Sequence, residues 1–213
     1  MSRVMRPFTI VALATLLAGC SALGGKHTPF SIHSPKLSPF APAATTPVDW
    51  QLQIALPQAS SALDSPRIAV MPHPGVLEVY PAARWRDPAP RLLRSLVVEA
   101  FDLSGRVGGV SGANVGLSAD YALAIDLRDF QAEVGRDGTR AAIRLQARLF
   151  DLRGNRIVAT RAFDETAAAA NSDVGNVVAA FETALAQLMP ELVNWTITSG
   201  NAAWAEMANN ASP

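Results

Sequence analysis

Apolar and polar residues alternate most regularly between positions 120 and 152. Two consecutive predicted strands each place every second residue on one apolar face: Tyr121, Leu123, Ile125 and Leu127 in the first, and Ile143, Leu145, Ala147 and Leu149 in the second. A period of two is typical of a strand with one buried face. Asp137-Gly138 between them is a strong signal for a two-residue hairpin turn.

This turn predicts an irregularity in the first of the two strands. It places Phe130 opposite Leu145, but Phe130 is out of phase with Leu127. We therefore expect a one-residue β-bulge near Arg128 or Asp129. A second tight turn, at residues 154–155, leads into a third strand over 156–163. The three strands are expected to form an antiparallel meander.

Shorter strand patterns and two helical patterns flank this meander. Strands are predicted over 50–56, 67–71 and 76–80, and the first two end at prolines. A helix is expected to start at Asp87-Pro88 and end at Gly105. A second helix is expected from Asp173 to Trp195, with a kink or restart at Pro190. This order predicts an α+β fold, in which a small mixed or antiparallel sheet carries two main helices packed on one face.

The N-terminus has the layout of a secretory signal peptide. Arg3 and Arg6 precede an apolar run over 8–17, which ends in Leu17-Ala18-Gly19-Cys20. The last four residues look like a lipobox, so residues 1–19 are predicted to be removed and Cys20 to be acylated. Cys20 is the only cysteine, so it has no partner for an internal disulfide. Ser21 follows it, which favours the outer membrane in the enterobacterial sorting rule.

The boundaries of the folded part follow from composition. Residues 20–47 hold five prolines among many serines, threonines and alanines, so they are predicted to form a lipidated, extended tether. Residues 28–33 could pair as a short edge strand. The folded domain is expected over 48–197, and the small, polar residues 198–213 are expected to be disordered.

Charge and motif content argue against several functions. The chain has 18 basic and 18 acidic residues, and loss of Arg3 and Arg6 leaves 16 against 18, a net charge of −2. No basic block is present, so nucleic-acid binding has no electrostatic footprint. A nucleophile elbow has a glycine two residues after its serine, and the residue two places after Ser111 is an alanine. His27, His33 and His73 lack metal-ligand spacing. Neither a metal, a cofactor nor catalysis is predicted.

A further acidic group and an aromatic string each leave two interpretations. Asp126, Asp129 and Glu133 fit a solvated strand face better than an acid/base pair. The string from Tyr80 to Trp85 concentrates Tyr80, Arg84 and Trp85, residue types that dominate protein interfaces. These three are candidate partner-binding residues. The alternative is that Trp85 packs over the end of the sheet.

At several points the sequence resembles one family, the ABC-type transport auxiliary lipoproteins, which include the PqiC-like proteins. The resemblance lies in the lipobox, in Leu63-Asp64-Ser65-Pro66-Arg67-Ile68-Ala69-Val70, in the Tyr80–Trp85 string with Asp87, in Ala119-Asp120-Tyr121-Ala122-Leu123 with Phe130, and in the run from Val177 to Trp195. It spans residues 28–195. One departure is Pro29-Phe30-Ser31-Ile32, where the family has a Tyr-Tyr-x-Leu-like strand.

The resemblance implies a small α+β fold and a non-catalytic part in lipid transport across the Gram-negative envelope. The implied partners are a periplasmic protein with a mammalian-cell-entry (MCE) domain and its ABC permease and ATPase. A second copy of this chain is a further candidate partner. The implied place is the periplasmic face of the outer membrane, with acyl chains such as palmitate as the anchor. The alternative function is an envelope scaffold or regulatory lipoprotein of a secretion or cell-wall synthesis complex.

Overall fold

The computed structural model describes residues 30–40, 46–112 and 118–211. The chain divides into a short unit, Met1–Phe30, and a folded unit, Ser31–Pro213. The predicted signal peptide, Cys20 and the first part of the predicted tether therefore lie outside the described residues.

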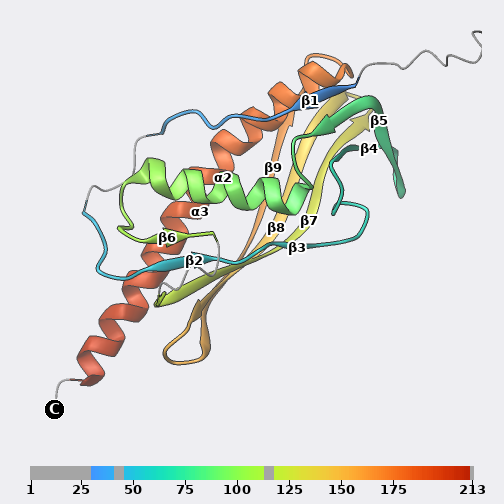
Figure 1. Ribbon diagram of the computed structural model, residues 1–213. Helices are drawn as coiled ribbons and strands as arrows, with labels where there is room; N and C mark the ends of the chain where they lie inside the picture. Colours follow the sequence, from blue (N-terminus) through green and yellow to red (C-terminus); the bar gives the residue numbers. More distant parts are fainter. Residues whose placement is uncertain (1–29, 41–45, 113–117, 212–213) are drawn as a thin grey trace, which may run out of the picture. The chain divides into compact units, whose positions relative to one another are not determined.

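One long strand, β7, organises the sheet (Figure 1). The nine strands of the described residues are β1 (Ser31–His33), β2 (Leu52–Ile54), β3 (Gln58–Ala59), β4 (Arg67–His73), β5 (Val76–Trp85), β6 (Val110–Ser111), β7 (Tyr121–Gly135), β8 (Gly138–Asp151) and β9 (Arg156–Ala168). Along one edge β7 pairs in parallel with β2, then β3, then β4. Along its other edge it pairs with β8 throughout. The sheet is therefore mixed, as predicted.

Strands β7, β8 and β9 form the expected antiparallel meander. The predicted bulge is confirmed: Leu127 pairs with Leu145, but the next pair is Asp129 with Arg144, so Arg128 is the extra residue. The predicted position of the first turn is wrong, because Gly135 pairs with Gly138 and the turn comprises residues 136–137. Phe130 consequently faces Ile143 rather than Leu145, and its side chain still points into the core.

Two helices, α2 (Ala89–Ser104) and α3 (Val174–Ala211), cover one face of this sheet and also contact each other. Helix α2 begins at Ala89, two residues after the predicted cap Asp87, with no side-chain cap. It ends as predicted at Gly105, whose φ of 60° is the left-handed conformation that favours glycine. The helices and the inward face of β7 and β8 enclose one apolar core, so the predicted α+β fold is confirmed.

Helix α3 corrects two expectations at the C-terminus. It runs without a restart through Pro190 to Ala211, so the prediction of a disordered tail from residue 198 is wrong up to that point. The reason is packing that a local pattern does not reveal. Gly200 and Ala203 are buried, and the ring of Trp204 lies 6.5 Å from that of Tyr121. The last turns of the helix thus cover the start of β7.

The N-terminal part of the folded unit is also more ordered than a tether. Strand β1 pairs in parallel with β5, with Ser31 level with Ala83, which is the expected edge strand. After it, Pro35 is buried, and the backbone N–H of Lys36 donates to a carboxylate oxygen of Glu182 on α3 at 3.0 Å. The folded unit therefore begins at β1, ahead of the predicted boundary at residue 48.

Candidate interaction surfaces

The Tyr80–Trp85 string occupies the second half of β5, and its aromatic end lies inside the protein. Trp85 is 1% exposed, and its indole makes edge contacts with Phe130 at 5.6 Å and Phe181 at 5.2 Å. This is the packing interpretation of Trp85. Its ring cannot touch a partner in this structure, so its assignment as a contact residue is corrected.

The other two candidates lie nearer the surface. Arg84 is exposed, and it is level with Ile32 on β1 and Arg67 on β4. Tyr80 is half-buried, and burial, with the nearby carboxylate of Asp173, raises the pKa of its phenol. Its hydroxyl is buried and makes no hydrogen bond with any residue that the structure describes. Of the three candidate residues, Arg84 is the one that a partner could reach most directly.

Sequence reasoning missed a group of exposed apolar residues at one end of the sheet, which we call the hairpin patch: Val76, Leu77 and Val79 on the β4–β5 hairpin, and Val134 on the neighbouring β7–β8 hairpin. These side chains are 40–44% exposed. Val76 and Leu77 are adjacent, so they point to opposite faces of β5, yet both are exposed. The tip of the hairpin therefore projects past the helices. The available signal was the sequence Val76-Leu77-Glu78-Val79, which does not alternate as a half-buried strand would.

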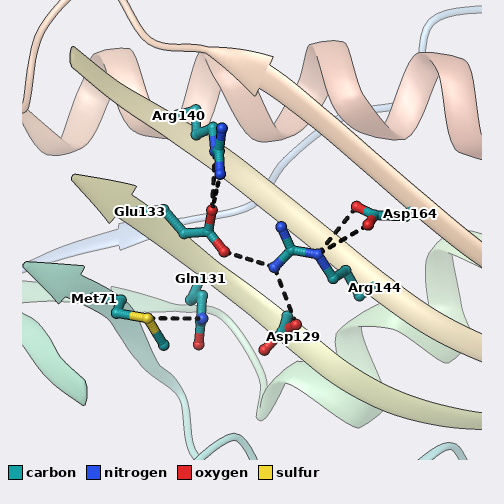
Figure 2. A network of polar contacts seen from close by, with 7 residues as sticks. All are labelled: Met71, Asp129, Gln131, Glu133, Arg140, Arg144 and Asp164. Atoms are coloured by element: carbon teal, nitrogen blue, oxygen red, sulfur yellow. Dashed lines mark hydrogen bonds and ion pairs between the residues drawn. The ribbon is translucent and has the colours of Figure 1, made fainter. Parts of the chain in front are cut away.

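The sheet face opposite the helices carries a network of ion pairs (Figure 2). Arg144 on β8 lies at its centre and contacts Glu133 at 2.6 Å and Asp129 at 3.1 Å on β7. On the other side it contacts Asp164 on β9 at 3.1 Å. Arg140 makes a second contact to Glu133, at 2.7 Å. Three neighbouring strands are thereby joined through their side chains.

The pKa values in this network fit a structural role. The hydrogen bond from Arg144 is the main cause that lowers the pKa of the Glu133 carboxyl, against the opposing effect of burial. The same contact raises the pKa of the Arg144 guanidinium. An acid catalyst near neutral pH requires a carboxyl with a raised pKa instead. Asp129 and Glu133 therefore act here as partners of arginine, which agrees with the solvated-face interpretation.

An open groove of about 520 Å³ adjoins both features. Its lining includes Met71, His73 and Pro74 from the β4–β5 hairpin, Val134 from the hairpin patch, and Arg140 from the ion-pair network. Its walls carry both charge signs and some apolar surface. The groove shows that the β4–β5 and β7–β8 hairpins lie side by side at one end of the sheet.

The remaining sequence candidates do not gather into a site. Ser111 is buried on the short strand β6, and His33 contacts the Ser31 hydroxyl at 2.8 Å. Within the described ranges, no three His, Cys, Asp or Glu side chains are placed to hold a metal ion. Among the same residues, no helix has the length and apolar character required to cross a membrane.

Comparisons with known proteins agree with this fold. The crystal structure of protein XCC0632 from Xanthomonas campestris is 39% identical, covers 82% of this chain and 99% of its own, and superposes with a TM-score of 0.77. An uncharacterised protein, bll6063, from Bradyrhizobium diazoefficiens is 29% identical over 191 residues. That match covers 85% of this chain but only 49% of the relative, so this chain spans about half of that protein's length.

The family model for the ABC-type transport auxiliary lipoprotein component matches residues 31–193. The match begins with β1 and extends well into α3, so it covers most of the folded unit that the structure describes. The expected resemblance is confirmed: this chain belongs to the ABC-type transport auxiliary lipoprotein family.

Proposed function

We propose that this protein is a non-catalytic, membrane-anchored subunit of an MCE-type system that moves lipid across a Gram-negative envelope. Its partners are an MCE-domain periplasmic protein and the ABC permease and ATPase that drive transport. The observation that carries the proposal is the family match over residues 31–193. The arginine-paired carboxylates of the outer sheet face support a structural rather than a chemical contribution.

Anchoring is assigned to Cys20, with acyl chains holding the protein on the periplasmic face of the outer membrane. Two or three chains on one residue give stable attachment where a single chain does not. Cys20→Ser tests this, because it removes the acylated thiol. Intact mass of membrane-extracted protein should show an acylated mature species in the wild type and an unprocessed precursor in the variant. An acylated mature species in both would refute the assignment.

The contact with the partner is assigned to the surface of β5 around Tyr80 and Arg84, with Trp85 supporting that surface from inside the core. Exposure of Arg84 and burial of Trp85 motivate this division of roles. Arg84→Ala should weaken the contact without affecting folding, since exposed arginines contribute little to stability. Arg91→Ala is the matched control, because Arg91 is also exposed but lies on α2 rather than on β5.

Affinity capture from detergent-solubilised membranes tests the whole proposal. The wild type and Arg91→Ala should retain an MCE-domain protein together with an ABC permease and ATPase, and Arg84→Ala should retain less of them. Co-purified lipid is then identified by mass spectrometry. Capture of secretion or cell-wall synthesis proteins in place of the transporter would overturn the proposal in favour of an envelope scaffold.

A further inference from the structure

The hairpin patch gathers at one end of the sheet together with the point where the chain enters the fold. Strand β4 runs parallel to β7, with Met71 level with Glu133, so the β4–β5 and β7–β8 turns lie at the same end. The groove lined by Pro74 and Val134 joins these two turns. Figure 1 shows β1, the β4–β5 hairpin and the start of α3 together at this end, with the C-terminal end of α3 at the other.

The direction of β1 relates this end to the predicted anchor. Strand β1 is parallel to β5, so from Ser31 it runs away from the hairpin turn. Ser31, the first residue of β1, is therefore the end of that strand that lies nearer the hairpin turn. Ser31 is level with Ala83, and Val76 lies seven residues further toward the turn, which is at most about 23 Å, because β5 is irregular between Val79 and Arg84.

The number of residues before β1 limits the distance between anchor and patch. Eleven peptide units separate Cys20 from Ser31, and a chain spans at most about 3.6 Å per residue, or roughly 40 Å. This exceeds the 23 Å of strand, so the hairpin patch can reach the surface that holds the acyl chains. Reach alone does not choose between the two ends of the sheet, and the position of Ser31, at the end of β1 nearer the hairpin turn, favours the end with the hairpin patch.

The chemistry of the patch suits a lipid surface. Val76, Leu77, Val79 and Val134 are each 40–44% exposed, which is apolar area that water solvates at a cost. The charged residues nearby have both signs: Glu78 and Asp137 are exposed, and so are Arg136 and Arg140. A surface of this kind does not select a headgroup of one charge. It can place its apolar side chains about 5–10 Å deep at the headgroup boundary.

Resting on the lipid anchor of the proposed function, we propose that the hairpin patch docks on the bilayer that holds the acyl chains. The bilayer then has a second contact with the protein besides the lipidated cysteine. This contact sets the orientation of the domain: the β4–β5 hairpin faces the membrane, and the opposite end of the sheet points away from it.

Site-specific fluorescence on the full-length lipoprotein tests this proposal. Cys20 is the only native cysteine and its thiol is acylated, so a new cysteine is the sole free thiol for an environment-sensitive dye. Leu77→Cys and Val134→Cys report on the hairpin patch. Leu152→Cys and Ile157→Cys are matched controls, because these residues are 46% and 51% exposed at the β8–β9 turn, at the opposite end of the sheet. Each variant is reconstituted in phosphatidylethanolamine–phosphatidylglycerol vesicles.

Lipids spin-labelled near the headgroup should quench a dye at position 77 or 134 several-fold more than a dye at position 152 or 157. The emission maximum of the dye should also shift to the blue at positions 77 and 134. Because the hairpin patch is labelled at two separate positions, a local folding defect in one variant would not by itself account for the result. Vesicle flotation in the same samples tests the anchor. A protein that does not float overturns both the anchor and this proposal. Equal quenching at the two ends, in a protein that floats, overturns the docking alone. Shielding that appears only at high protein density would assign the patch to a second copy instead.

Discussion

The contact between Gly200 and Trp50 gives a prediction whose sign is unusual. Gly200 lies inside α3, where replacing glycine with alanine ordinarily stabilises a protein by about 1 kcal/mol. A Cβ at this position would lie 2.6 Å from one indole carbon of Trp50 and 3.1 Å from two others. Trp50 has little freedom to move, because it is 1% exposed and its indole N–H donates to the Asn201 side chain at 2.9 Å.

The two effects can be weighed against each other. Overpacking of a filled core costs about 1–3 kcal/mol, and this contact is too short to be relieved without moving the ring. A contact of 2.6 Å places the cost in the upper part of this range, at about 2–3 kcal/mol, and subtracting about 1 kcal/mol for helix propensity leaves Gly200→Ala destabilising by about 1–2 kcal/mol. For a chain of this size, that lowers Tm by about 2–8 °C. Gly175→Ala is the matched control in the same helix, because a Cβ there meets nothing within 4 Å.

Guanidinium and thermal unfolding of the unlipidated mature chain, followed by tryptophan fluorescence, provide the assay. Gly175→Ala should be neutral or stabilising, and Gly200→Ala should be destabilising. A Tm for Gly200→Ala equal to or above that of the wild type would show that α3 does not pack against Trp50 in solution. In that case the description of residues 198–211 as part of the fold would be wrong.

Three further predictions follow from other contacts. Trp85→Ala should lower the free energy of unfolding by about 3–5 kcal/mol as a fully buried aromatic, whereas Arg84→Ala should change it little; equal unfolding midpoints would refute the core placement. Arg144→Met should destabilise the protein by about 1–2 kcal/mol at pH 7, where Glu133 is ionised in both states. The lowered pKa of Glu133 means that this stabilisation is present above the unfolded pKa and is lost as the pH falls through the folded one, so the two unfolding curves should converge in acid. Burial raises the pKa of Tyr121 to about 12. The neutral phenol therefore contributes up to about 2–3 kcal/mol to the free energy of unfolding, in full below pH 10 and progressively less as the pH rises toward 12. Tyr121→Phe should remove this part of the alkaline unfolding transition.

The meander and the two helices could be predicted because their patterns are local. Alternation over 121–149, a turn signal near Asp137 and the glycine at 105 each act within a few residues. The bulge could also be located, because the change of phase between Leu127 and Phe130 is visible in the sequence itself. The turn was misplaced by one residue, since several turn positions keep the same residues facing the core.

The features that were missed depend on contacts far apart in sequence. The last turns of α3 consist mostly of small or polar residues. They are helical because they form hydrogen bonds with the side chains of Trp50 and Tyr121, which are far away in the sequence. Residues 31–40 have the composition of a tether but add a strand to β5. The residues next to Trp85 in the sequence fit a core position and an interface position equally well. Its contact with Phe181, 96 residues away in the sequence, shows that Trp85 belongs to the core.

The extra residue Arg128 divides β7 into two halves with opposite parity. Before it, odd-numbered residues such as Leu127 face the helices, and after it even-numbered residues such as Phe130 do so. The same shift places Asp129 and Glu133 on the outer face beside Arg144. In a family alignment, a relative without the bulge should therefore show a one-residue gap at this point and not elsewhere in the strand. Deletion of Arg128 alone from this chain should accordingly leave a regular strand, in which Leu127 and Phe130 both still face the helices.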